Sequence, residues 1–254
     1  MLPQKEFNMK IAVISDIHGN MEAVDAVMED IKKTECDKLF VLGDYAMAGP
    51  EPKKTIQYFI EKENENTIMI QGNTDLMIAD YNPDLFKKLS QQAPVMASAL
   101  KDDVKQMSLS DKLFLKNLPA QKEIELEGVS FLLVHGSPRK NNEDILPDTS
   151  IEEVESMLKD VKAQVVLCGH THIPCGFQTK NKQTVVNAGS VGRPFTPEPK
   201  ACYLMISVAQ GKCVFEHKFV KYDNKKASEK LKEREFFGAD KLAETLINPK
   251  KRHF

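Results

Sequence analysis

Short apolar runs alternate with amphipathic segments over the first 75 residues. Lys10–Ser15, Lys38–Leu42 and Thr67–Ile70 are apolar runs of strand length, whereas Met21–Lys33 and Glu51–Lys62 place apolar residues at helical spacing. This strand–helix–strand–helix–strand order predicts parallel strands joined by right-handed crossover helices. In sheets of that kind a ligand site lies beyond the carboxyl ends of the strands.

The pattern changes after residue 75. Residues 76–118 lack strand alternation, and we expect short helices and loops that form a lid or insertion. Glu127-Gly128 predicts a hairpin between two strands, and Ser150-Ile-Glu-Glu153 is a capping box that opens a helix ending near Lys159. The strands expected in this half are Glu123–Leu126, Val129–Val134, Val165–Cys168, Gln183–Val186, Ala201–Val208 and Lys212–Val220. The sequence thus predicts an α/β domain over residues 9–220, with two amphipathic helices in a C-terminal extension, 221–254, packed on it.

Composition narrows the class of protein. The chain has 254 residues, enough for one substantial domain, and its 41% hydrophobic and 28% charged content is typical of soluble globular proteins. A formal charge of −2 gives no general attraction to nucleic acid or to an anionic membrane, and no apolar run approaches the roughly 18 residues of a membrane span. Residues 1–8 lack the apolar stretch of a signal peptide, and we expect them to be either an extension before the first strand or residues foreign to the native chain.

The cysteines favour a reducing compartment. There are five, an odd number without CxxC spacing, mostly in or beside apolar runs: Cys36, Cys168, Cys175, Cys202 and Cys213. Such residues are typical of small buried thiols, so we predict a cytoplasmic protein.

Candidate metal ligands gather where strands should give way to loops. Four of the six histidines lie directly after apolar runs, and two further runs end in an Asp or Asn. Packing offers no reason for such residues to converge at several strand ends, whereas a metal site does. The set comprises Asp16, His18, Asp44, Asn73, His135, His170 and His172.

Seven oxygen and nitrogen ligands are too many for one four-coordinate ion and suit two ions that share a bridging carboxylate. Mixed N/O ligation without thiolate favours Mn²⁺, Fe or Zn²⁺ and argues against Ca²⁺ or an iron–sulfur cluster. Cys175, three residues after His172, is a weaker candidate for a soft ligand. Two ions about 3.5–4 Å apart can hold a bridging hydroxide and clamp a phosphate for in-line attack.

The chain resembles the calcineurin-like metallophosphoesterase superfamily over roughly residues 9–220. The resemblance rests on six motifs in order, each after a predicted strand: DIH, GD, GNTD, HG, GHTH and NAGS. It implies a four-layer α/β/β/α sandwich with two divalent ions, Mn or Fe first and Zn or Ni as alternatives. It also implies one ion on Asp16, His18 and His172, a second on Asn73, His135 and His170, and Asp44 as the bridge.

Two longer segments, Gly43–Pro50 and Asn187–Pro194, resemble small prokaryotic phosphoesterases often described as diadenosine-tetraphosphatase-like. The expected activity is hydrolysis of a phosphodiester, a dinucleoside polyphosphate or a phosphomonoester by attack of a metal-bound hydroxide. The expected partner is a small phosphorylated substrate such as a nucleotide, not a membrane or nucleic acid. A metal-depleted scaffold or protein-interaction module on the same fold is the alternative. The expected catalytic set is Asp16, Asp44, Asn73, His135 and Arg193.

Thr74 departs from the family pattern. Much of the superfamily has His at this position, where it helps to protonate the leaving oxygen, and a threonine cannot act as a general acid near neutral pH. Either Asp75 or another group substitutes, or good leaving groups are preferred, or the metals carry most of the catalysis. A prokaryotic phosphodiesterase branch has Cys there, so the departure need not abolish activity. Arg193 either binds a substrate phosphate bidentately or pairs with an acidic neighbour.

Overall fold

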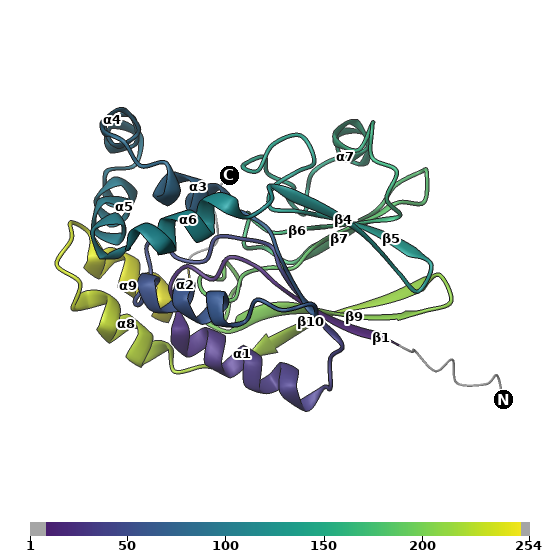
Figure 1. The fold of residues 1–254 in the computed structure, drawn as a ribbon, viewed down its shortest axis with the longest axis horizontal. Coiled ribbons are helices and arrows are strands. Elements are labelled where there is room, and N and C mark those ends of the chain that lie inside the picture. The colour runs from purple at the N-terminus through teal and green to yellow at the C-terminus, as the bar shows by residue number, and fades with distance from the viewer. Residues whose placement is uncertain (1–8, 250–254) are drawn as a thin grey trace.

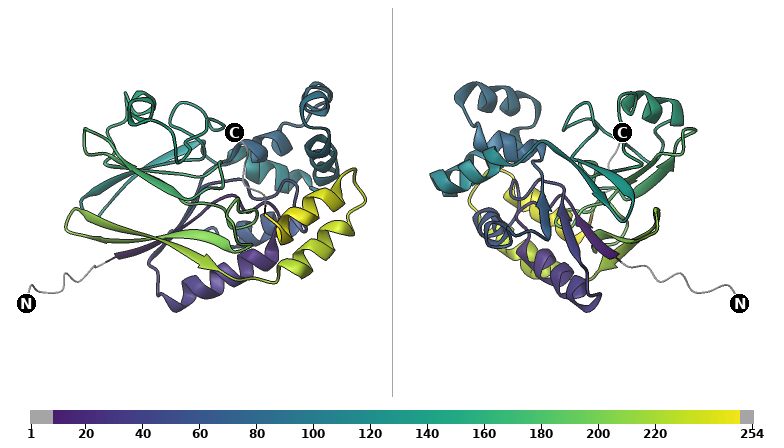
Figure 2. Two further views of the ribbon diagram at one scale, coloured as in Figure 1. Left: turned by 180° about the vertical axis from the view of Figure 1, so that it is seen from behind. Right: turned by 45° about the vertical axis from the view of Figure 1, so that its right-hand side comes forward.

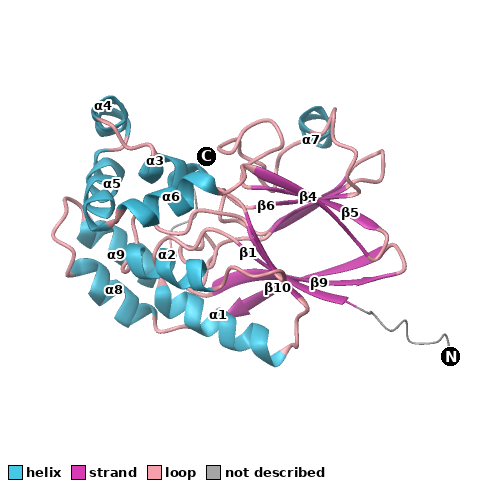
Figure 3. Ribbon diagram, viewed as in Figure 1, coloured by secondary structure: helices cyan, strands magenta, loops and turns pink. Residues whose placement is uncertain are grey.

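The computed structural model describes residues 9–249, so the expectation for residues 1–8 lies outside the described chain. Two five-stranded sheets face each other, and helices cover their outer faces (Figure 1, Figure 3). No helix in the described range is long and apolar enough to span a membrane.

The first sheet has the order β10-β9-β1-β2-β3. The predicted parallel core is confirmed: β1 (Met9–Ile14), β2 (Lys38–Val41) and β3 (Thr67–Met69) run parallel. The crossover helices are α1 (Met21–Lys33) and α2 (Pro52–Glu61). Antiparallel strands then extend the sheet beside β1, namely β9 (Ala201–Ala209) and β10 (Lys212–Val220).

The second sheet has the order β4-β5-β6-β8-β7. The hairpin strands β4 (Gln121–Leu126) and β5 (Val129–Val134) lead into the parallel strands β6 (Val165–Cys168) and β8 (Thr184–Asn187). The sequence pattern missed one strand, β7 (Cys175–Gln178), which pairs only with β8 at the sheet edge.

Helices fill the segments where the sequence lacked strand alternation. Residues 73–117 form α3 (Asn73–Ala79), α4 (Pro83–Gln92), α5 (Pro94–Gln106) and α6 (Leu109–Asn117). The described part of the C-terminal extension forms α8 (Asn224–Lys232) and α9 (Ala239–Ile247). Both groups lie at the same end of the molecule in all views (Figure 1, Figure 2).

Three apolar clusters account for the layers. Ile11 and Phe40 of the first sheet pack with Phe131 and Leu167 of the second to form the core between the sheets. A larger cluster joins the first sheet to its helices, and a third lies under α7 (Ile151–Met157) on the outer face of the second sheet. The predicted α/β/β/α order is therefore confirmed.

Candidate metal centre

The carboxyl ends of parallel strands from both sheets meet at one place, and the predicted site residues lie in the loops that leave them. Loop-to-loop hydrogen bonds join them: the Asp16 amide donates to the Gly43 carbonyl after β2, and the Gly169 amide donates to the His135 carbonyl after β5. Five candidate ligands have left-handed backbones, with φ values between 46° and 66°: Asp16, His18, Asp44, His170 and His172. Residues other than glycine rarely adopt this conformation, which persists only where the surroundings hold it.

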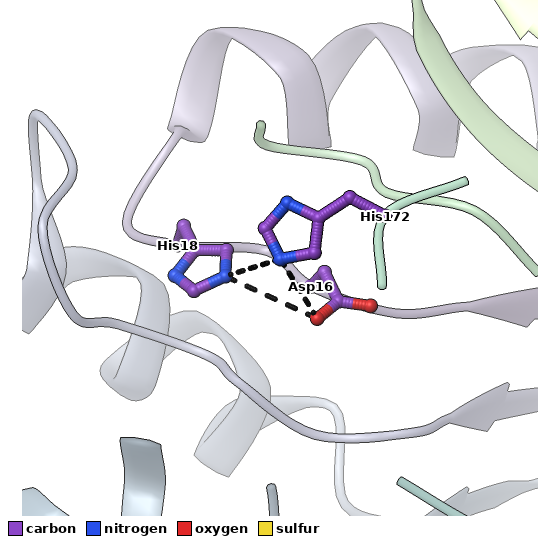
Figure 4. Close-up of side chains that lie close together, drawn as sticks. All are labelled: Asp16, His18 and His172. Carbon is purple, nitrogen blue, oxygen red and sulfur yellow. Dashed lines mark hydrogen bonds and ion pairs between the residues drawn. The ribbon is translucent and has the colours of Figure 1, made fainter. Parts of the chain in front are cut away.

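Asp16, His18 and His172 form the first cluster (Figure 4). The two Nε2 atoms of His18 and His172 lie 3.1 Å apart. Asp16 Oδ1 lies 3.2 Å from His172 Nε2 and 3.9 Å from His18 Nε2. All three side chains are buried.

The hydrogen bonds of these imidazoles determine which nitrogen is free. His18 Nδ1 donates to the Met47 carbonyl at 2.8 Å, and His172 Nδ1 donates to the Arg193 carbonyl at 2.6 Å. In the neutral rings both Nε2 atoms are therefore acceptors, and they face one another. Asp16 Oδ1 is buried and has no hydrogen-bond partner among the described residues. Three acceptors that converge without a donor are the arrangement that a bound cation stabilises, so these residues fit a metal ion.

Asp16, Asp44 and His135 form the second cluster. His135 Nε2 lies 3.3 Å from Asp44 Oδ2, 3.9 Å from Asp16 Oδ1 and 3.1 Å from Asn73 Oδ1. His135 Nδ1 donates to the Leu42 carbonyl at 2.7 Å, which again leaves Nε2 directed at the oxygens.

Two carboxylates lie between the histidines of the two clusters. Asp44 Oδ2 is 3.7 Å from His18 Nε2 as well as close to His135, which suits the bridging position expected from the sequence. Asp16, which the sequence assigned to one ion, also approaches histidines of both clusters. The centre therefore has two candidate bridging groups.

His170 borders the second cluster. Its ring centroid lies 5.3 Å from that of His135, and its Nε2 lies 3.3 Å from Asp144 Oδ1. Sequence reasoning missed Asp144, because no motif marks it. The available signal was an acidic residue in the loop that follows the strand-end His135.

The ionisable side chains of the centre shift one another's pKa values. Burial raises the pKa of Asp16, but the neighbouring His172 and His135 outweigh it and lower that pKa to about 2. The pKa of Asp44 is likewise held well below its usual range, because His135 outweighs burial. Burial and the adjacent His172 lower the pKa of His18 to about 4. Burial lowers the pKa of His135, but Asp44 and Asp16 outweigh it and raise that pKa to about 10, so His135 is protonated in the metal-free protein and loses this proton when it binds a metal.

The Asp75 carboxylate binds backbone amides of the neighbouring loops. Its Oδ2 accepts from the amides of Asp44 and Gly72, its Oδ1 accepts from the Tyr45 amide, and the residue is fully buried. Burial, together with the nearby Asp44, raises the pKa of Asp75 to about 7. Because both oxygens hold backbone amides, Asp75 anchors the loop that carries Asp44 and is poorly placed to replace the missing histidine at Thr74.

Arg193 forms no salt bridge with any carboxylate among residues 9–249, which argues against the acidic-partner alternative. Its Nε is buried without a hydrogen-bond partner in that range, and its NH1 contacts Met96 Sδ at 3.8 Å. Burial lowers the pKa of Arg193 to about 10, so the guanidinium stays charged at neutral pH. Nearby, the Phe195 ring stacks on His172 with centroids 4.8 Å apart.

The loop after β8 supports the ligands. Asn187 Nδ2 donates to the Gly169 carbonyl, and Ser190 Oγ donates to the Asp16 carbonyl. Both side chains therefore hold the loops that carry the candidate ligands. Cys175 belongs to neither candidate cluster, and all five cysteines are free.

Comparisons with known proteins agree with this geometry. The family described as the calcineurin-like phosphoesterase superfamily domain matches residues 9–211. An uncharacterized protein of Methanocaldococcus jannaschii is 29% identical, over 87% of this chain and 91% of its own. Among solved structures, a hypothetical protein of Pyrococcus horikoshii has a TM-score of 0.85 at 23% identity, covering 96% of this chain and 99% of its own. A metallophosphoesterase of Sphaerobacter thermophilus has a TM-score of 0.75 at 21% identity, covering 94% and 98%.

Proposed function

The chain belongs to the calcineurin-like phosphoesterase superfamily, and from this premise we propose that it hydrolyses phosphate esters with the help of two divalent metal ions. One observation carries the proposal. Buried imidazole nitrogens and carboxylate oxygens converge, and each Nδ1 of His18, His135 and His172 is committed to a backbone carbonyl, which leaves each Nε2 directed at the carboxylates. The alternative of a metal-free scaffold loses support, because it gives no reason to bury these acceptors together.

The proposed ligand sets follow the two clusters. Asp16, His18 and His172 would hold one ion, and Asn73, His135 and His170 would hold the other, with Asp44 between them. When bound, the two ions supply positive charge that lowers the pKa of a water and offsets charge on the phosphate. The mixed N/O donor set favours Mn²⁺ or Fe, with Zn²⁺ and Ni²⁺ as alternatives.

Arg193 is the proposed phosphate-binding residue. Its guanidinium is charged and lacks a carboxylate partner in the described chain, so a phosphate oxygen can take that place with a charge-assisted hydrogen bond. Its carbonyl meanwhile orients His172. Arg193 would therefore bind the substrate phosphate with its guanidinium and orient His172 with its carbonyl.

Thr74 bears on the kind of ester. The Thr74 amide donates to Asp44 Oδ1 at 2.9 Å, and its buried hydroxyl has no partner in the described chain. With no histidine here and with Asp75 occupied by backbone amides, leaving-group protonation would be weak. We therefore favour substrates whose leaving oxygen is already stable as an anion, such as pyrophosphate linkages of dinucleoside polyphosphates or aryl diesters.

The test combines metal content with activity. Protein purified without chelator is expected to contain divalent metal, and with added Mn²⁺ it should hydrolyse a nitrophenyl diester faster than an alkyl diester, because nitrophenolate leaves without protonation. Asp44→Asn should abolish the activity, whereas Glu125→Gln, an equal charge change on the exposed strand β4, should not. Absence of both metal uptake and hydrolysis in the wild type would overturn the proposal. A panel of dinucleoside polyphosphates, cyclic nucleotides and phosphomonoesters then identifies the substrate class.

A further inference from the structure

The loop that follows Asp44 is irregular yet completely buried. Residues 44–50 belong to no helix or strand, and every one of them is buried. Backbone amides and carbonyls in such a segment need partners from elsewhere in the chain, because water does not reach them. The position of this loop therefore depends on the side chains that supply those partners.

The amides of His18 and Gly19 bond the Asp44 and Tyr45 carbonyls, and two carboxylates and one guanidinium supply further partners. Asp75 binds the first two amides of the loop, as described above. Asp103 of α5 accepts from the Ala48 amide at 2.9 Å, and Arg234 NH1 donates to the Gly49 carbonyl. Between these anchors lies the Met47 carbonyl, which accepts the hydrogen bond from His18 Nδ1.

Arg234 comes from the connection between α8 and α9, which lies against α5 (Figure 1). Its NH2 group forms ion pairs with Asp102 at 2.5 Å and with Asp103 at 2.7 Å. The Arg234 side chain is 8% exposed and Asp103 is fully buried, and the guanidinium carbon lies 4.9 Å from the Phe236 ring centroid. The result is a closed ring of contacts from Arg234 through Asp103 to Ala48 and Gly49.

We propose that Arg234 and Asp103 are positioning residues for His18: they fix the Met47 carbonyl, which sets the orientation of the imidazole and its free nitrogen. Residue 234 lies beyond residues 9–211, where the family match ends, so the C-terminal extension would take part in building the metal site. The consequence for metal binding rests on the proposed function. The consequence for the His18 ring does not.

Loss of Arg234 has a defined local effect. The Gly49 carbonyl loses its donor, and the buried Asp103 and the partly exposed Asp102 lose their counter-ion. Residues 47–49 then lose one of their anchors, and we expect the Met47 carbonyl, the acceptor of the His18 Nδ1 proton, to be less firmly fixed. Removal of outer partners of metal-binding histidines typically weakens metal affinity by about 10- to 100-fold.

Lys230 provides a matched control. This cation lies on α8 in the same extension and pairs with Glu22 at 2.6 Å and with Glu51 at 2.8 Å. It ties the extension to α1 and to the start of α2, and its ion-pair partners in the described chain, Glu22 and Glu51, lie outside residues 47–49. Lys230→Met therefore removes a bridging cation without touching the acceptor of His18.

The experiment uses the full-length chain in three variants: Arg234→Met, Arg234→Lys and Lys230→Met. Nitrogen NMR of the metal-free proteins reports the His18 tautomer, and calorimetric titration with Mn²⁺ reports the two binding steps. The wild type and Lys230→Met should show the Nδ1-protonated ring. Arg234→Met should show mixed tautomers and about 10- to 100-fold weaker Mn²⁺ binding in one step. Arg234→Lys keeps the positive charge but loses the paired N–H donors of the guanidinium, so its tautomer mixture and its Mn²⁺ affinity should lie between those of the wild type and Arg234→Met.

A single tautomer and unchanged binding in both Arg234 variants would overturn the inference, as would an equal loss in Lys230→Met. If Arg234→Met fails to fold, Arg234→Lys decides by the same two readouts. A wild type that takes up no Mn²⁺ would defeat the proposed function, yet the tautomer comparison would still decide whether Arg234 orients His18.

Discussion

Replacing Gly72 with alanine places one methyl group against the candidate bridging carboxylate. Gly72 precedes α3 with φ −89° and ψ 172°, a backbone that alanine also adopts, so any effect of the substitution comes from Cβ alone. That Cβ would lie 2.1 Å from Asp44 Oδ1 and 2.4 Å from the Asp44 amide nitrogen. The only large change is therefore a collision with Asp44.

The size of the collision sets the expected effect. Close carbon–oxygen contacts in proteins are about 3.3 Å, so the Asp44 oxygen must retreat by about 1.2 Å. Metal–ligand distances tolerate only about 0.2 Å, and a misplacement of about 1 Å in an active site typically costs about 100-fold in rate. We expect Gly72→Ala to lower kcat/KM by at least about 100-fold and to destabilise the metal-free protein by about 1–3 kcal/mol.

The assay measures kcat/KM on a nitrophenyl diester at saturating Mn²⁺, metal content by elemental analysis, and stability by urea unfolding. Gly176→Ala is the control, because its Cβ would meet only the Val185 carbonyl oxygen at an ordinary 3.7 Å. A Gly72→Ala protein that retained two ions per chain and wild-type kcat/KM would refute the reasoning that Asp44 must stay in place.

Three further outcomes follow from the site. Asp44→Asn should lose far more activity than Arg193→Ala in the diester assay, because it affects both ions, and similar losses would contradict the bridging role. Rates across a leaving-group series should depend steeply on leaving-group pKa, Thr74→His should reduce that slope, and a flat wild-type slope would point to an undetected acid. Burial, only partly offset by Arg234, raises the pKa of Asp103 to about 6, whereas the unfolded value is about 3.9. Between about pH 4 and pH 6, Asp103 is therefore protonated in the folded metal-free protein and ionised in the unfolded chain, so stability falls as the pH rises through this range. Urea unfolding should show about 1.4 kcal/mol of Asp103-dependent stability at pH 5 that is lost by pH 7.5, and an equal loss in Asp103→Asn would contradict this.

The sequence predicted the elements whose apolar pattern was strong. The parallel strands β1, β2 and β3 and their crossover helices carry continuous apolar runs or clear helical spacing, and they appear within a residue or so of the predicted bounds. The strand β7 was missed because Cys175–Gln178 is short, contains a glycine and alternates only between half-buried and exposed positions. Its pairing with β8, and not its own pattern, makes it a strand.

The candidate ligands could be predicted because they follow strand ends, a position that sequence reveals. The residues that hold these ligands in position could not be predicted from the sequence. Arg234 reaches Gly49 and Asp103 across more than 130 residues of chain, and neither charge lies in a motif. Asp75 illustrates a second limit, since its role depends on which of its oxygens accept backbone amides, and only the fold determines that.

The hydrogen bond between His135 and Leu42 crosses from one sheet to the other. His135 follows β5 of the second sheet, and the carbonyl that accepts its Nδ1 proton follows β2 of the first. The His135 ring thus has two roles: it joins the two sheets through Nδ1, and it contributes Nε2 to the candidate metal centre. A change that separates the sheets slightly must also turn this ring, so the candidate metal centre is sensitive to the spacing of the two sheets. If His135 is a metal ligand, as proposed, adaptation of the centre to another metal is constrained in the same way, because a replacement has to bind the new ion and still join the two sheets.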